Sequence, residues 1–98
     1  MIELNHEQKI KLLKLARKTI ADSLNRSFDM NEQDFSEVIF GEKCGAFVTL
    51  HIKGNLRGCI GYIEGVKNIP ETVKDMALSS AFRDPRFMPL SKDEYNNI

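Results

Sequence analysis

The apolar positions near the start of the chain recur at helical spacing. Asn5 stands before this segment and Gln8 follows three positions later, which is the spacing of a capping box. Apolar residues then return every three or four positions and share one broad face. They are Leu12, Leu13, Ala16, Ile20 and Leu24. The pattern predicts an amphipathic helix over residues 6–24.

A second helical pattern begins at Pro70. Proline suits the first position of a helix, and Glu71 places a negative charge in the first turn. Small and apolar residues then form a narrow stripe that can pack closely on a sheet. The stripe consists of Val73, Met76, Ala77, Ser80 and Ala81. Because Pro85 disfavours a helical conformation of Asp84, we predict that this helix covers residues 70–82.

Between the two helices the pattern changes to that of β-strands. Residues 46–52 and 56–63 are two runs rich in strand-forming residues, separated by a turn that contains Gly54. They predict a β-hairpin over residues 45–63. With the two helices, the hairpin gives an α+β fold with a small, mostly antiparallel sheet. In the preceding loop, the aromatic residues Phe28, Phe35 and Phe40 act as anchors, and residues 37–40 suggest a short strand.

The register of the hairpin decides which side chains share a face, because a slip of one residue moves every side chain to the other face. A three-residue loop places Leu50 opposite Gly58 and Val48 opposite Ile60, which keeps one face apolar. A two-residue Gly-Asn loop would mix buried and polar positions on each face. Since that mixture costs several kcal/mol of burial energy, we prefer a loop at residues 53–55.

The preferred register gathers polar side chains on the face away from the core. They are Thr49, His51, Arg57 and Cys59. In this register His51 lies opposite Arg57. Gly58 and Gly61 lack side chains, so a ligand or another backbone can approach the strand there.

Length and charge limit the possible functions. The 98 residues suffice for one small domain. The 14 Lys and Arg balance 14 Asp and Glu, which argues against a nucleic-acid partner. A row formed by Lys11, Lys14 and Lys18 fits a solvated helix face. We predict no membrane partner, because no apolar run approaches the ~20 residues that span a bilayer.

Cysteine usage indicates a reducing compartment. Cys44 and Cys59 are too few for a disulfide scaffold, and charged residues interrupt the N-terminal segment where a signal peptide would lie. We therefore expect a cytoplasmic protein with reduced thiols. The cysteine and histidine spacing does not resemble a zinc site, and no glycine-rich phosphate loop leads into a helix. No metal and no cofactor are predicted.

The hexapeptide LRGCIG at residues 56–61 resembles the signature of the AMME chromosomal-region protein family, also called component A of the AmmeMemoRadiSam system. Residues 12–17, 45–50 and 81–87 resemble its other recurrent blocks, in the same order. The resemblance implies an α+β fold and a link with a Memo-type protein and a radical SAM protein. It also implies a functional site. The candidates are Arg57, Gly58, Cys59 and Gly61, with Arg83, Asp84 and Arg86 as additional ones.

The family domain continues for about as much chain again. We therefore expect residues 1–98 to form a single partial domain, a truncated version of a larger one. A new strand would begin near residues 95–98. An exposed sheet edge in such a domain favours pairing with another chain, so a homo-oligomer is expected.

Cys59 is the strongest candidate for chemistry. A neighbouring cation lowers the pKa of a thiol and makes it a nucleophile, and Arg57 and His51 are the candidate neighbours. The alternative is a half-buried cysteine that serves only packing. Arg57 itself either binds a small anionic molecule or pairs with an acid such as Glu64. Asp84 either lines the same cleft with the nearby arginines or pairs with one of them.

Two functions remain open. The first is a binding component that acts with the Memo-type and radical SAM proteins through residues 56–61. The second is a cysteine-dependent enzyme or redox component in which Cys59 is the thiolate, Arg57 orients an anionic substrate and His51 assists proton transfer. We prefer the binding component, because half a domain is a poor basis for a complete catalyst.

Overall fold

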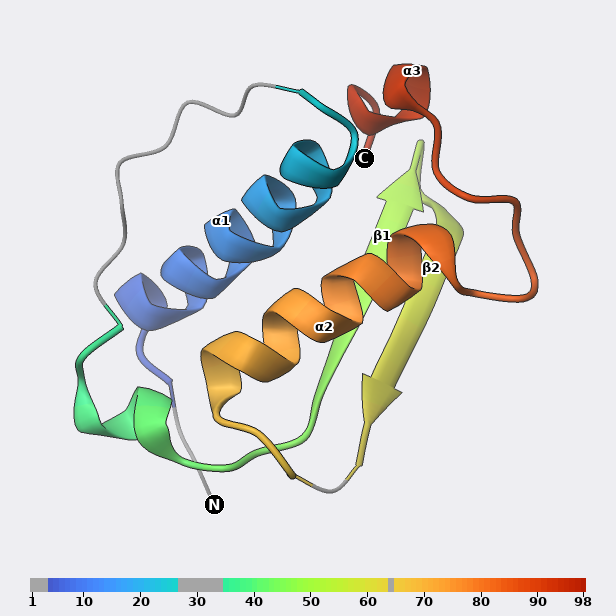
Figure 1. The fold of residues 1–98 in the computed structure, drawn as a ribbon. Coiled ribbons are helices and arrows are strands. Elements are labelled where there is room, and N and C mark those ends of the chain that lie inside the picture. Colours follow the sequence, from blue (N-terminus) through green and yellow to red (C-terminus); the bar gives the residue numbers. More distant parts are fainter. Residues whose placement is uncertain (1–3, 27–34, 64) are drawn as a thin grey trace.

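A computed structural model describes residues 4–26, 35–63 and 65–98, so Phe28 and Glu64 lie outside the described residues. The elements are α1 (His6–Ser23), the 3-10 helix η1 (Val38–Gly41), β1 (Ala46–Ile52), β2 (Asn55–Tyr62), α2 (Ile69–Phe82) and α3 (Lys92–Tyr95). α2 packs on both strands and α1 packs beside α2 (Figure 1). The two long helices thus form one layer and the hairpin forms the other. This arrangement confirms the predicted α+β fold.

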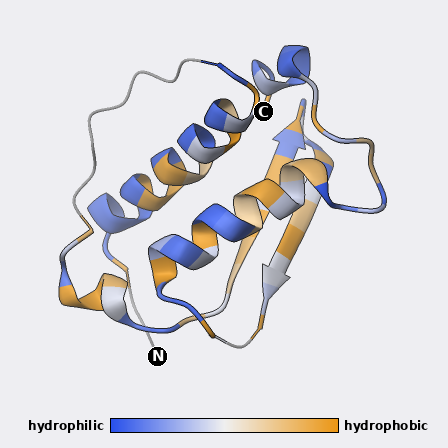
Figure 2. Cartoon of the chain, viewed as in Figure 1, coloured by the Kyte–Doolittle hydropathy of each residue, from blue (hydrophilic) through white to orange (hydrophobic). Residues whose placement is uncertain are grey.

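α1 begins as its capping box predicts. The side chains of Asn5 and Gln8 each accept a hydrogen bond of 2.8 Å from the backbone N–H of the other residue. The helix ends at Ser23, and Asn25 follows with a φ of 56°, in the left-handed region that a right-handed helix cannot continue. Hydrophobic and hydrophilic residues alternate along both long helices (Figure 2). The buried apolar positions of α1 are Leu12, Ala16, Ile20 and Ala21.

Leu13 departs from the predicted apolar face. Its side chain is 70% exposed, although its neighbour Leu12 is buried. The reason is that α1 packs mainly against α2, which covers only part of its apolar surface. No helix in the described ranges has the length and apolar character needed to cross a membrane.

α2 lies directly on the hairpin through its small residues. The predicted stripe is buried along its whole length. Ser80 Oγ accepts a hydrogen bond from Ile60 N–H (3.0 Å) and donates one to the Val48 carbonyl (2.6 Å). A Cβ atom on Gly58 would lie 2.2 Å from the Ser80 carbonyl oxygen. The helix therefore approaches both strands closely because small residues face each other.

The body of the hairpin has the predicted register and its tip does not. Leu50 lies opposite Gly58 and Val48 opposite Ile60, as expected. At the tip, however, Lys53 and Gly54 form a two-residue turn with φ values of 51° and 78°. Two positive φ values are typical of a type I′ turn, whose twist matches that of the strands.

The tight turn leaves one residue of β2 without a partner on β1. His51 lies opposite Leu56 and Leu50 opposite Gly58, so Arg57 between them forms a β-bulge. The predicted pairing of His51 with Arg57 is therefore wrong. A bulge re-aims the extra side chain, and this one leaves the polar patch that the sequence predicted.

Two further elements differ from the predictions. Residues 37–40 do not form a strand; the 3-10 helix η1 lies there instead and buries Phe40, whose ring meets Phe35 edge-on at 5.0 Å. Near the end of the described chain, α3 ends at Tyr95 and no strand follows over residues 95–98. In both places a helical turn buries an aromatic side chain.

Candidate functional site

Asp84 joins the segment after α2 to the outer edge of β2. Its side chain is buried, with only 4% of the residue exposed. Oδ2 accepts hydrogen bonds from Cys59 N–H (3.0 Å) and from Arg86 Nη2 (2.7 Å). Oδ1 accepts from the backbone N–H (3.1 Å) and Nε (3.0 Å) of Arg86. Four donors from two residues therefore surround one carboxylate.

Arg86 completes the contact with β2. Its Nη2 also donates to the Cys59 carbonyl at 3.3 Å. Cys59 directs its N–H and its C=O away from β1, and the side chains of Asp84 and Arg86 thus provide a hydrogen-bond partner for each. Such a contact closes a strand edge that would otherwise invite pairing with another chain.

The charges of this pair stabilise each other. Hydrogen bonds from the Arg86 guanidinium hold the pKa of Asp84 well below its usual range; burial opposes this shift, and the Cys59 N–H reinforces it. The same contact raises the pKa of Arg86. Both side chains are therefore ionised at neutral pH.

Arg57 makes a second ion pair next to the first. From the β-bulge, its Nε and Nη2 donate to the two oxygens of Glu94 at 2.8 and 3.0 Å, and Nη2 also donates to the Met88 carbonyl at 2.7 Å. The Phe87 ring lies 5.5 Å from the Arg57 guanidinium and 5.6 Å from that of Arg86. The predicted alternative of an ion pair thus applies to Arg57, with Glu94 as the partner.

Glu94→Gln is expected to lower the free energy of unfolding by about 1 kcal/mol at pH 7, since a partly exposed pair contributes modestly. Hydrogen bonds from Arg57 lower the pKa of Glu94 to about 2. The contribution is therefore complete above the unfolded pKa near 4.5 and is lost as the pH falls towards 2. Urea unfolding of wild type and Glu94→Gln at pH 7 and at pH 3 measures the loss of stability and its dependence on pH.

Asp93→Asn is the matched control for this prediction. Asp93 lies in the same short helix, and no side-chain partner of it is found in the described part of the chain. We expect a change of a few tenths of a kcal/mol, from the helix dipole alone. Equal losses for Glu94→Gln and Asp93→Asn would contradict a specific role of the Arg57 pair.

Cys59 lies on the face of the hairpin that points away from the helices. Its half-buried Sγ is 3.2 Å from Thr49 Oγ1. His51 is exposed, and among the described residues no hydrogen bond links it to Cys59. We define the outer face by the side chains of Phe47, Thr49, His51, Leu56 and Cys59.

Neighbouring groups occupy the space beside the two glycines of the predicted site. The Ser80 carbonyl occupies the space beside Gly58. A Cβ on Gly61 would lie 2.4 Å from the Phe47 ring, which therefore lies across this glycine. Backbone thus approaches both glycines, because the Ala46 carbonyl oxygen would also lie 2.4 Å from a Cβ on Gly61.

The predicted site thus separates into distinct groups. Asp84, Arg86 and the backbone of Cys59 meet, Arg57 pairs with Glu94, and His51 stays on the outer face. Arg83 is exposed at the end of α2, and its side chain has no partner in the described ranges. Sequence reasoning missed Glu94, although the Ser91-x-x-Glu94 spacing is that of a capping box and signals a helix start.

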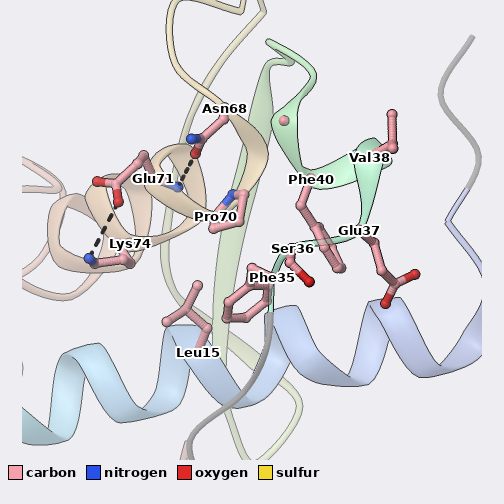
Figure 3. Close-up of a pocket in the computed structure, with 11 residues that line it drawn as sticks. Leu15, Phe35, Ser36, Glu37, Val38, Phe40, Asn68, Pro70, Glu71 and Lys74 are labelled. Atoms are coloured by element: carbon pink, nitrogen blue, oxygen red, sulfur yellow. Dashed lines mark hydrogen bonds and ion pairs between the residues drawn. The ribbon is translucent and has the colours of Figure 1, made fainter.

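A hollow of about 400 Å³ lies at the opposite end of α2. Phe35, Phe40 and Leu15 form its apolar wall, and Lys74 pairs with Glu71 at 3.6 Å on its rim (Figure 3). None of the predicted site residues lines it. Within the described ranges, no three His, Cys, Asp or Glu side chains gather as they would around a metal ion.

Comparison with known proteins places the chain among relatives that are longer than itself. The AMMECR1 family model matches residues 13–98. A protein from Methanothermobacter thermautotrophicus is 42% identical over 87 residues, which cover 89% of this chain and 45% of the relative. A protein from Sulfolobus acidocaldarius is 37% identical over 100 residues, covering 98% and 44%. The chain therefore spans less than half the length of these relatives.

A solved structure has the same fold. The crystal structure of the uncharacterized protein PH0010 from Pyrococcus horikoshii matches with a TM-score of 0.76 at 33% identity, over 89% of this chain and 45% of that one. The region matched by the family model includes the LRGCIG hexapeptide, Asp84 and Arg86. The resemblance inferred from the hexapeptide is confirmed. The chain belongs to the AMMECR1 family.

Proposed function

We propose that this chain is a binding component that acts with a Memo-type protein and a radical SAM protein, and that the outer face of the hairpin is its recognition surface. The exposed apolar side chains of that face carry the proposal. Phe47 is 61% exposed and Leu56 is 42% exposed, side by side with Thr49 and Cys59. Exposed aromatic and aliphatic groups on a rigid support are typical of protein interfaces.

The support of this face favours recognition over chemistry. Asp84 and Arg86 bind the backbone of Cys59, and the carboxylate of Glu94 forms an ion pair with Arg57. The residues of the hexapeptide thereby hold the outer face in place. The outer face itself carries no carboxylate, so a partner with an apolar patch complements it.

Isothermal titration of the purified chain with each partner protein tests this proposal. The two partners come from the genome that encodes the chain, and each is titrated separately. We expect binding to at least one of them and at least about tenfold weaker binding for Phe47→Ser. Val66→Ser is the matched control, because Val66 is 66% exposed but lies outside the outer face. No binding to either protein, or equal effects of the two variants, would refute the proposal.

The alternative is a cysteine-dependent enzyme or redox component. It is favoured by the half-buried thiol of Cys59, which lies beside the Thr49 hydroxyl and belongs to the residue whose backbone carbonyl accepts a hydrogen bond from the Arg86 guanidinium. Alkylation of the folded protein as a function of pH separates the two functions, with Cys44 as internal control. An apparent pKa of Cys59 well below ~8.5 would favour the thiolate. Full partner binding by Cys59→Ser would favour recognition.

A further inference from the structure

The outer face of the hairpin is too small to hold a protein partner by itself. A strand rises about 3.3 Å per residue, and neighbouring strands lie about 4.8 Å apart. The 7 residues of β1, paired with β2, therefore present a face of about 220 Å². A stable protein interface buries about 800 Å² on each partner. A protein that recognises the outer face must therefore cover neighbouring surface as well.

The segment after α2 continues this surface beyond the outer edge of β2 (Figure 1). Arg86 Nη2 donates a hydrogen bond to the Cys59 carbonyl. Two residues further along the segment, the Met88 carbonyl accepts one from Arg57 Nη2. The segment thus runs along β2 from Cys59 towards the tip of the hairpin, on the side away from β1. The surface of the molecule therefore passes from the outer face onto this segment.

Hydrogen bonds fix the segment although it has no regular secondary structure. The backbone N–H of Phe87 donates to the Asp84 carbonyl at 3.1 Å. The backbone N–H of Leu90 donates to the Ala81 carbonyl at 2.8 Å and thereby returns the segment to the end of α2. Because these bonds already order the segment in the free chain, little conformational entropy is lost when a partner binds it.

Met88 protrudes from this ordered segment. It is 80% exposed, whereas Leu90, two positions further on, is 3% exposed. The hydrogen bond from Arg57 to the Met88 carbonyl fixes the backbone at this point. Methionine is enriched at protein interfaces, and its flexible side chain adapts to irregular apolar pockets. An exposed methionine on a fixed backbone is therefore suited to an apolar pocket of a partner.

One positive charge on the segment has no counter-charge among the described residues. Arg86 pairs with Asp84. Arg57, beside the segment, pairs with Glu94. Arg83 is exposed, and no side-chain partner of it is found in the part of the chain that the structure describes. A carboxylate on the partner would complement this charge.

We propose that residues 83–89 form a second part of the recognition surface. The protein that binds the outer face places an apolar pocket over Met88 and a carboxylate beside Arg83. This proposal rests on the proposed function, because one partner covers both parts of the surface. It assigns binding roles to two side chains outside the LRGCIG hexapeptide and states the chemistry of the partner that they fit.

Isothermal titration with the Memo-type protein and with the radical SAM protein tests the role of Met88. We expect about tenfold weaker binding for Met88→Ser and nearly unchanged binding for Met88→Leu, which keeps an apolar side chain of similar volume. Val38→Ser is the matched control, because Val38 is 86% exposed and lies on η1, at the opposite end of α2. Equal effects of Met88→Ser and Val38→Ser would overturn the proposal.

Arg83→Glu tests the charge. We expect about tenfold weaker binding at low salt and a smaller effect at high salt, since salt screens exposed charges. Lys14→Glu is the matched control, because Lys14 is exposed on α1 and has no side-chain partner within the described ranges. Binding of Arg83→Glu at the wild-type affinity at low salt would overturn the pairing with a carboxylate.

Phe47→Ser separates this proposal from the proposed function. If Phe47→Ser weakens binding and neither Met88→Ser nor Arg83→Glu does, the outer face acts alone and the role of residues 83–89 is refuted. If neither protein binds the wild-type chain, both proposals are refuted. Weaker binding of all three variants, with wild-type affinity for Val38→Ser and Lys14→Glu, supports both.

Discussion

Gly58→Ala is expected to lower the free energy of unfolding by about 3 kcal/mol, measured by urea unfolding at pH 7. The added Cβ would lie 2.2 Å from the Ser80 carbonyl oxygen, which belongs to the backbone of α2. Backbone cannot rotate away as a side chain can, so the helix must move from the sheet. Such a movement also stretches the two hydrogen bonds of Ser80 Oγ to Ile60 and Val48.

Gly41→Ala provides the matched control. Gly41 lies in η1, and nothing comes within 4 Å of a Cβ built on it. We expect unchanged stability, or a gain of up to about 1 kcal/mol from a less flexible unfolded chain. A small loss for Gly58→Ala, similar to the effect at Gly41, would show that α2 is not held against the hairpin at this point.

This prediction bears on the meaning of the hexapeptide. Arg57, Gly58 and Cys59 are adjacent in sequence, and yet each meets a different part of the fold. Arg57 pairs with Glu94, Gly58 lies under Ser80, and Cys59 is held by Asp84 and Arg86. The hexapeptide therefore connects β2 to α2, to the segment after it and to α3. Its residues shape the outer face even where they do not form it.

Local patterns were sufficient to predict the main elements. The capping box of Asn5 and Gln8 set the start of α1, and apolar alternation set the register of the hairpin body. The tip could not be derived in the same way. Its turn uses Lys53 with a positive φ, which lysine rarely adopts, so the usual Asn-Gly or Asp-Gly signal is absent. Burial does not distinguish the observed Lys53-Gly54 turn from the predicted loop at residues 53–55, because both keep the register of the hairpin body and the tip is exposed.

Contacts between distant residues were beyond sequence reasoning. Arg57 and Glu94 are 37 positions apart, and Cys59 and Asp84 are 25 apart. The bulge that frees Arg57 depends on the turn type, and the position of Glu94 depends on α3. An error of one residue at the tip therefore placed Arg57 in the wrong patch. The expected link between Asp84 and a nearby arginine needed only local geometry and is present in the structure.

Asp84→Asn is expected to destabilise the protein more than Glu94→Gln at pH 7, with a fall of several degrees in Tm. The variant keeps the shape of the side chain but removes the charge that accepts four hydrogen bonds. The amide group of asparagine would also place a donor among donors. Because the Cys59 N–H is one of the four donors, the variant weakens the attachment of the segment after α2 to the outer edge of β2.

The pH dependence separates the charge from the shape of Asp84. Since the pKa of Asp84 is lower in the folded state, the unfolded state binds more protons near pH 3, and stability rises with pH. The contribution is complete above the unfolded pKa of about 4 and declines below it. The difference between wild type and Asp84→Asn should therefore be largest at pH 7 and shrink as the pH falls below 4.

Asp22→Asn is the control that fixes the interpretation of this difference. Asp22 pairs with Lys18 at 2.9 Å on the exposed side of α1, where ion pairs contribute little. Its variant should follow the wild-type stability curve at every pH. Parallel curves for wild type and Asp84→Asn would mean that shape alone fixes the segment to β2. Converging curves would show that the ionised carboxylate holds Cys59, and with it the face that we propose for recognition.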